Sequence, residues 1–251
     1  MRPYRGAYVR PIPAQGELRD LAWGATLRRV APRRRVPGGL TIQLRPDDLL
    51  RKLRMQRPRR LLLLVVDVSG SMGGALMDLA RRTALGLLDQ AYLDRDPVAM
   101  IAFCQRSAEL LLPPTRHAAQ VPRALVDLTC GGTTPLAAGL QLAERTLLAH
   151  ARREAAPSAA LLLISDGRAN VGAHPGQAAL DAELKAVARR LSRTPNLQRI
   201  FVDTTAAGQD DHAARWLATQ LHADRHLLWQ LQQRSPDPAR TLAQELIRAL
   251  R

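Results

Sequence analysis

Lysine, aromatic side chains and cysteine are all scarce in this chain of 251 residues. Its 37 Lys and Arg residues against 22 Asp and Glu give a net charge of +15, yet Lys52 and Lys185 are the only lysines. Arginine used throughout in place of lysine, in a chain rich in alanine and leucine, is typical of codon bias rather than of a selected phosphate-binding patch. Aromatic residues make up 3% of the chain, too few for surfaces that stack on bases. We therefore expect no nucleic-acid partner.

The shortage of cysteine and of long apolar runs excludes further classes of protein. Cys104 and Cys130 cannot build a disulfide framework or a four-thiolate zinc site, and we expect both to be reduced and partly buried. The longest apolar run, residues 61–66, has the length of a strand, far below the roughly 20 residues that span a bilayer. Apolar residues make up 46% of the chain, enough for a core. We expect a cytoplasmic protein with no signal peptide or membrane span.

Proline sets the first 58 residues apart from the rest. Seven prolines in this segment exclude long helices and central strands. Residues 18–30 have a helical pattern, and Pro46 is placed to begin a short helical turn. We predict that residues 1–58 form an extended N-terminal arm, which packs on or leads into a globular domain at residues 59–251.

Strand and helix patterns alternate from residue 59 onward. Continuous apolar runs predict strands buried on both faces, and apolar residues spaced three and four apart predict amphipathic helices. The predicted strands are 61–66, 98–103, 108–112, 159–165, 199–203 and 226–229, and the predicted helices are 76–91, 114–128, 135–152, 176–191, 213–221 and 238–250. This alternation predicts a doubly wound α/β domain with a mainly parallel sheet and helices on both faces. Glycine-rich phosphate-binding motifs are absent, so we expect no nucleotide site.

Hydroxyl and carboxylate residues follow the predicted strands where a parallel sheet binds its ligands. Asp67, Ser69 and Ser71 come directly after the first strand, Thr134 precedes a long helix, and Asp166 follows the strand at 159–165. The Asp-x-Ser-x-Ser spacing turns alternate side chains toward one point. These hard oxygen donors suit an octahedral Mg²⁺ or Mn²⁺, and suit zinc or copper poorly. The five residues are therefore the candidate metal ligands.

These five residues resemble the metal-ion-dependent adhesion site of von Willebrand factor A domains, also called integrin I domains. More narrowly, the chain resembles the C-terminal part of the D subunit of magnesium chelatases and cobalt chelatases. The matching stretches are residues 8–10, 25–32, 65–71, 99–103, 108–115 and 132–140. The resemblance implies a Rossmann-like fold, direct Mg²⁺ binding by the two serines and the threonine, and aspartates that act directly or through water. It also implies that the last coordination position is left for a partner's carboxylate.

The same resemblance implies partners and a function. The partners would be an AAA+ ATPase subunit of the chelatase I type and a large tetrapyrrole-binding subunit, and the complex would insert magnesium or cobalt into a tetrapyrrole. This chain would be a binding subunit, not catalytic alone. Full D subunits begin with an AAA+-like module and an acidic, proline-rich linker, and this chain shows neither. We therefore expect a separate subunit or a shortened paralogue.

Alternative interpretations remain for several of these features. The chain could be an adaptor for another AAA+ machine, unrelated to tetrapyrroles. Catalysis by Asp67 and Asp166 themselves is disfavoured, because the site has no His or Lys base. His222 and His226 are four residues apart, but they have no third metal ligand nearby in sequence and are better interpreted as surface residues. Arginine clusters such as residues 33–35 are either solvated or contact an acidic face of a partner.

Overall fold

The computed structural model describes most of the chain, in two compact units at residues 1–58 and 59–251. The described segments are residues 7–15, 18–31, 44–55, 60–70, 96–116, 131–154, 157–174 and 176–234, together with residues 78, 82, 85, 86, 237, 241 and 244. Ser71, Cys130 and most of the helices predicted at residues 76–91, 114–128 and 238–250 lie outside these segments.

The first unit contains a small sheet and a helix, so the prediction of an extended arm is wrong. Its elements are β1 (Ala7–Pro13), α1 (Trp23–Val30), the 3-10 helix η2 (Pro46–Asp48) and β2 (Leu50–Met55). Strands β1 and β2 pair antiparallel, with an irregularity in register between Tyr8 and Arg10. Both strands of a two-stranded sheet are edge strands, and edge strands tolerate proline. Pro11 and Pro13 therefore fit within β1.

Hydrogen bonds connect helix α1 and the residue before it to the start of strand β2. Thr26 Oγ1 accepts a hydrogen bond from the Leu50 amide at 3.0 Å, and the Ala22 amide donates to the Leu50 carbonyl at 2.7 Å. Arg54 Nε donates to Asp20 at 2.5 Å, and this hydrogen bond holds the pKa of Asp20 below its ordinary value. The first unit thus has its own tertiary contacts.

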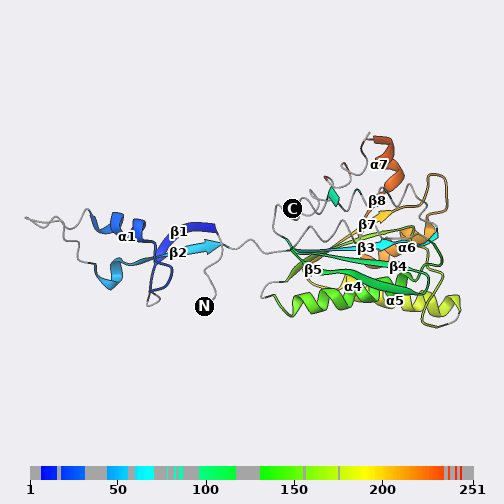
Figure 1. Cartoon of the computed structure of the whole chain (residues 1–251), viewed down its shortest axis with the longest axis horizontal. Helices are drawn as coiled ribbons and strands as arrows, with labels where there is room; N and C mark the ends of the chain where they lie inside the picture. The colour runs from blue at the N-terminus through cyan, green and yellow to red at the C-terminus, as the bar shows by residue number, and fades with distance from the viewer. Residues whose placement is uncertain are drawn as a thin grey trace, which may run out of the picture. The chain divides into compact units, whose positions relative to one another are not determined.

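A six-stranded sheet forms the centre of the second unit (Figure 1). Its strands are β3 (Arg60–Asp67), β4 (Val98–Cys104), β5 (Ser107–Thr115), β6 (Ser158–Ser165), β7 (Leu197–Asp203) and β8 (Asp224–Leu227). Their order is β5-β4-β3-β6-β7-β8, and every neighbouring pair is parallel except β4 and β5. The predicted doubly wound, mainly parallel sheet is confirmed.

Two predicted element boundaries in this unit are wrong. The helix expected to begin at Pro114 does not begin there, since Pro113 and Pro114 both lie in β5, the outermost strand, whose pairing with β4 has two register shifts. An edge strand accommodates residues that cannot donate a backbone hydrogen bond. The strand expected at residues 226–229 ends at Leu227, opposite the last residue of β7, and α7 (Leu228–Arg234) begins directly after it.

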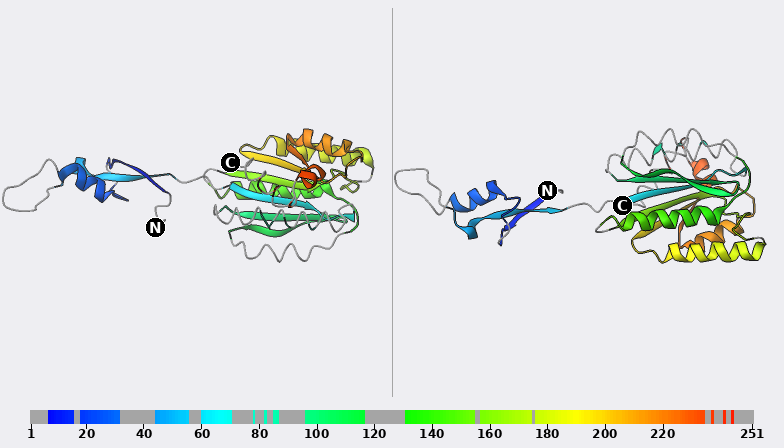
Figure 2. Two further views of the ribbon diagram at one scale, coloured as in Figure 1. Left: turned by 90° about the horizontal axis from the view of Figure 1, so that it is seen from above. Right: turned by 60° about the horizontal axis from the view of Figure 1, so that its bottom comes forward.

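Helices α4 (Leu136–Ala151), α5 (Gln177–Ser192) and α6 (His212–Leu221) cover one face of the sheet. Helix α7 lies on the opposite side from α4 and α5 (Figures 1 and 2). Strand β3 is buried on both faces, because Leu61 to Asp67 all have less than 9% exposure. The prediction of helices on both faces of the sheet is confirmed.

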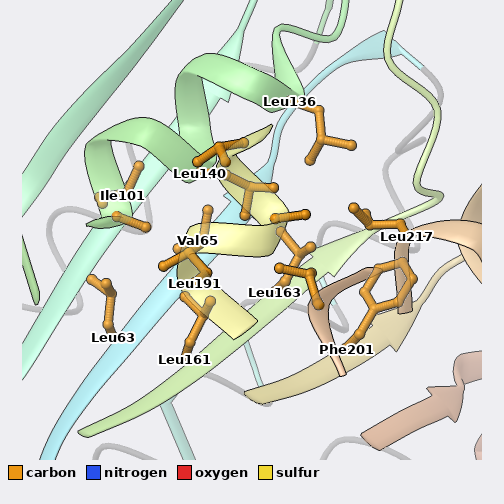
Figure 3. Packing of buried hydrophobic residues seen from close by; sticks show 14 of the residues in the cluster. Leu63, Val65, Ile101, Leu136, Leu140, Leu161, Leu163, Leu191, Phe201 and Leu217 are labelled. Carbon is orange, nitrogen blue, oxygen red and sulfur yellow. The ribbon is translucent and has the colours of Figure 1, made fainter. Parts of the chain in front are cut away.

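Alternate residues of the central strands point into one apolar cluster beneath these helices (Figure 3). The side chains from the strands include Leu63, Val65, Ile101, Leu161, Leu163 and Phe201, and those from the helices include Leu136, Leu140, Leu191 and Leu217. Complete burial of a leucine side chain contributes roughly 1.5–3 kcal/mol. The core therefore holds the strand ends rigidly enough to position the residues that follow them.

His150, at the end of α4, makes the stability of this unit sensitive to acid. Its Nε2 is buried and has no hydrogen-bond partner, and burial lowers the pKa of His150; the Arg116 and Arg153 charges also lower this pKa, whereas Glu154 raises it. As the pH falls, His150 takes up a proton near pH 6.5 in the unfolded chain, but only at a lower pH in the folded chain. We expect the contribution of His150 to the free energy of unfolding to fall as the pH drops from 7.5 to 5.5.

Replacement of His150 by glutamine should make this fall smaller. The measurement is urea unfolding at the two pH values, with His212→Gln as the control because His212 is exposed at the start of α6. The control should keep the wild-type pH dependence. Equal pH dependence in the two variants would contradict the assignment to His150.

Candidate metal centre at the carboxyl edge of the sheet

The candidate metal ligands lie where the order of the strands reverses. The chain runs from β3 to β4 on one side of β3, and later returns to β6 on its other side. Such a switch point leaves a crevice at the carboxyl ends of the two strands. Asp67 is the last residue of β3, Ser165 is the last residue of β6, and Asp166 follows directly. Both candidate aspartates therefore come from the strands that flank the switch point.

Asp67 is a fully buried carboxylate held by serine residues. Its Oδ1 accepts a hydrogen bond from the Ser69 amide at 2.9 Å, and its Oδ2 accepts one from Ser165 Oγ at 2.9 Å. Ser165 Oγ in turn accepts a hydrogen bond from the Gly167 amide at 3.1 Å. Within the described segments no Lys, Arg or His forms an ion pair with Asp67. A buried carboxylate in such surroundings favours a bound cation.

The electrostatics of Asp67 lead to the same conclusion. Burial raises the pKa of Asp67 to about 6; hydrogen bonds from Ser69 and Ser165 lower this pKa, and the negative charge of Asp166 raises it. A divalent cation near the two carboxylates would offset both the burial of Asp67 and its repulsion by Asp166, because the cation is the largest local charge in such a site. The residues present therefore fit a hard divalent cation.

Two backbone hydrogen bonds join the loop after β3 to the loop before α4. The Gly70 amide donates to the Gly132 carbonyl at 3.2 Å, and the Gly131 amide donates to the Val68 carbonyl at 3.0 Å. Gly132 has a φ of +82°, and a Cβ at this position would lie 2.8 Å from the side chain of Gln105. These contacts hold the Ser69 loop and the Thr134 loop side by side.

The Thr134 loop is also hydrogen-bonded to the loop after β6. The Thr134 amide donates to Asn170 Oδ1 at 2.6 Å, and the Asn170 amide donates to the Thr134 carbonyl at 3.2 Å. Sequence reasoning missed the roles of Asn170 and Ser165. Ser165 precedes Asp166 at the end of a strand, and this position could have indicated its role from the sequence. The role of Asn170 could not be found in this way, because it depends on a contact with a residue 36 positions away.

The structure thus places four of the five predicted ligands on three linked loops. Asp67, Ser69 and Thr134 are buried, and Asp166 is half-buried, with its Oδ1 accepting a hydrogen bond from the Arg168 amide at 3.0 Å. Ser71 lies outside the described segments. No cluster of three His, Cys, Asp or Glu side chains occurs in the part of the chain that is described. A site of two carboxylates and several hydroxyls would not form such a cluster.

Asp203 provides an internal comparison at the end of the neighbouring strand β7. It is fully buried, and its Oδ1 accepts a hydrogen bond from the Thr205 amide at 2.8 Å, as Asp67 does from Ser69. Its Oδ2, however, accepts a hydrogen bond from Arg225 Nε at 2.9 Å. Arg225 Nη2 also contacts Asp211 at 2.6 Å. The fold therefore neutralises one buried aspartate at this edge with an arginine, and leaves the other with hydroxyl and amide partners.

Gly167 brings the Asp166 loop against helix α6. Its φ is +75°, and a Cβ at this position would lie 2.6 Å from Ala214 Cα and 2.9 Å from the Ala214 amide nitrogen. Contacts under 3.0 Å to backbone atoms cannot be relieved by a side-chain rotation. Glycine at residue 167 therefore fixes how closely the loop approaches α6.

The two histidines considered as an alternative metal pair belong to separate elements. His222 is exposed and ends α6 in the left-handed conformation, whereas His226 is half-buried in β8. No third His, Cys, Asp or Glu completes a metal cluster with them in the described residues.

Known protein families match parts of both units. Residues 62–168 match the von Willebrand factor type A domain family, and residues 5–54 match the AAPxQ domain family. The magnesium-chelatase 60 kDa subunit of Cereibacter sphaeroides is 38% identical over 220 residues, covering 82% of this chain and 38% of that protein. The corresponding subunit of Rhodobacter capsulatus is 36% identical over 208 residues, covering 78% of this chain and 36% of that protein.

Solved structures agree on the fold. A BatB protein from Bacteroides thetaiotaomicron has a TM-score of 0.54 at 18% identity, and the match covers 75% of this chain and 98% of that one. Among the described residues, no helix is both long enough and apolar enough to cross a membrane. The chain spans less than two-fifths of the length of the two chelatase subunits. It is a von Willebrand factor A domain protein that resembles the magnesium-chelatase 60 kDa subunits over about four-fifths of its own length.

Proposed function

We propose that this chain is a Mg²⁺-dependent protein-binding subunit of an AAA+ metal chelatase. Its partners would be an AAA+ ATPase of the chelatase I type and a large tetrapyrrole-binding subunit, acting together in the cytoplasm. The observation that carries the proposal is that hydrogen bonds join the loops bearing Asp67, Ser69, Thr134 and Asp166 at the switch point of the sheet. The resemblance to chelatase subunits supports the choice of partners.

The proposed role of each residue follows from its chemistry. Ser69, Ser71 and Thr134 would hold the cation through hydroxyl oxygens, and Asp67 and Asp166 would balance its charge directly or through water. When bound, Mg²⁺ or Mn²⁺ supplies an open coordination position to an external Asp or Glu. The serine, glycine and asparagine contacts described above keep the loops in place before the cation arrives. This chain would therefore dock the AAA+ ring and leave ATP hydrolysis to it.

Removing the hydroxyl of Thr134 tests metal-bridged docking. We expect Thr134→Ala to weaken metal binding moderately and to leave the fold intact, because the change creates no buried charge. Ser69→Ala and Ser71→Ala should behave alike. Asp166→Ala should be more severe, since it removes half of the negative charge that balances the cation. All four should lose Mg²⁺-dependent association with the AAA+ subunit, and metal insertion by the reconstituted complex should fall with it.

Titration of the AAA+ subunit with and without EDTA is the measurement. Thr219→Ala serves as a control, because Thr219 is an exposed threonine on α6. ATP hydrolysis by the AAA+ ring alone should persist in every case. Metal-bridged docking is falsified if wild type and Thr134→Ala bind the ring equally, with or without EDTA.

An adaptor for a different AAA+ ATPase is the alternative function. The candidate metal centre selects a carboxylate on the partner, and this preference is the same for both functions. Reconstitution separates them. Chelatase activity that depends on this chain, with the AAA+ ring and the tetrapyrrole-binding subunit present, supports the first function. Mg²⁺-dependent binding to an AAA+ ring without any metal insertion supports the second.

A further inference from the structure

Most of the exposed large apolar side chains among the described residues lie in the first unit. Of the nine exposed large apolar side chains among the described residues, seven lie between residues 7 and 55. These seven are Tyr8, Val9, Leu18, Trp23, Leu27, Leu44 and Leu53. Scattered exposed leucines are ordinary, but this concentration in one small unit indicates an interaction surface.

Helix α1 carries the largest of these side chains. Trp23 is 54% exposed and Leu27 is 42% exposed, and the two lie four residues apart, on the same side of the helix. Thr26 and Val30 are buried against the rest of the unit. The apolar side of α1 therefore extends past the part that its own sheet covers. We call Trp23 and Leu27 the α1 face.

Charge indicates what would cover the α1 face. Residues 1–58 contain 14 of the 37 Lys and Arg residues but four of the 22 Asp and Glu residues, a net charge of +10. Arg28 and Arg29 lie in the last turn of α1 itself. A second copy of the chain would be repelled, because it carries the same charge. An acidic protein surface with an apolar recess matches both properties of this unit.

We propose that the α1 face is a second docking surface, for an acidic segment of the same AAA+ partner, and that it needs no metal. The proposal rests on the proposed function for the identity of the partner. Trp23 would be the central anchor, since docking would remove much of its exposed apolar surface from water. The arginines of the unit would attract the acidic segment and orient it.

The test measures binding of the full chain to the AAA+ subunit in EDTA, where the metal centre cannot contribute. We expect binding to persist in EDTA and to weaken as NaCl rises. The variant Trp23→Ser/Leu27→Ser should bind roughly tenfold or more weakly. Arg29→Glu should bind several-fold more weakly at low salt and less so at high salt. Both variants should keep the rise in melting temperature that we expect Mg²⁺ to give the wild-type chain.

Two controls on the second unit are matched to these variants. Leu148→Ser removes a leucine that is 48% exposed on α4, and Arg189→Glu reverses an exposed charge on α5. Both should bind in EDTA as the wild type does. Circular dichroism of the Trp23→Ser/Leu27→Ser variant checks that the first unit remains folded, and Arg29→Glu tests the proposal without altering an apolar residue.

Several results would overturn the proposal. Absence of any binding in EDTA would do so while leaving metal-bridged docking standing. If binding persists in EDTA and Mg²⁺ does not increase the affinity for the AAA+ subunit, the proposed function of the metal centre is rejected and docking at the α1 face is retained. Equal affinities of the wild type and the α1-face variants would reject the face. Tighter binding of the α1 face to phosphatidylglycerol vesicles or to duplex DNA than to the AAA+ subunit would also overturn the choice of an acidic protein.

Discussion

Replacing Asp67 by alanine should abolish the rise in melting temperature that millimolar Mg²⁺ or Mn²⁺ gives the wild-type chain. A ligand at 100 times its dissociation constant stabilises the folded state by about 2.7 kcal/mol, and all of this gain should disappear. The reason is that Asp67 is the fully buried carboxylate at the switch point, and its hydrogen bonds come from serine residues. Without it, the site would hold the charge of Asp166 alone.

Two further variants separate metal binding from folding. Asp67→Asn keeps the size of the side chain but removes its charge, so it should lose the metal response with a smaller loss of basal stability. Asp181→Ala removes an exposed carboxylate on α5 and should keep the full metal response. The measurement is thermal unfolding with and without each cation. A wild-type melting curve that neither cation shifts would show that the isolated chain has no working metal site.

Replacing Gly167 by alanine should give the largest loss of basal stability. A positive φ costs a residue with a side chain roughly 1–2 kcal/mol, and overpacking of a dense region costs about 1–3 kcal/mol more. The new Cβ would lie 2.6 Å from a backbone carbon of α6, so either the loop or the helix must move. We expect a loss of about 3 kcal/mol in the free energy of unfolding, and weaker metal binding because Asp166 precedes this residue.

Gly208→Ala is the matched control for this substitution. Gly208 also has a positive φ, +79°, but a Cβ there would meet nothing within 4 Å. It should cost only the conformational part, roughly 1–2 kcal/mol. Urea unfolding of both variants gives the comparison. A loss for Gly167→Ala no greater than that for Gly208→Ala would show that the loop does not press on α6.

The fold of the second unit could be predicted because its strands are local apolar runs and its helices are periodic. The strand ends at Asp67 and Ser165 follow directly from the runs that precede them. Boundaries at the sheet edges could not be predicted in this way. Pro114 looks like the start of a helix, yet β5 tolerates it because nothing pairs along that side in the described sheet.

The candidate site could be predicted where its residues are adjacent to strands, and the remainder could not. Asp67 ends β3, Ser69 lies two residues beyond it and Asp166 follows β6 directly, so their place follows from the topology. The hydrogen bonds between Thr134 and Asn170 depend on two loops that are distant in sequence and adjacent in space. The first unit was mistaken for an extended arm because its sheet pairs residues 37 to 48 positions apart, and such pairing leaves little local pattern.

The edges of both sheets also bear on how the chain behaves at high concentration. An exposed strand edge offers a row of unpaired backbone groups, on which a strand of another molecule can add. Here Pro113 and Pro114 remove two amide donors from β5, and β1 lacks the donors of Pro11 and Pro13. Strand β8, at the far edge, is four residues long. Aggregation by strand addition at β1, β5 and β8 is therefore disfavoured.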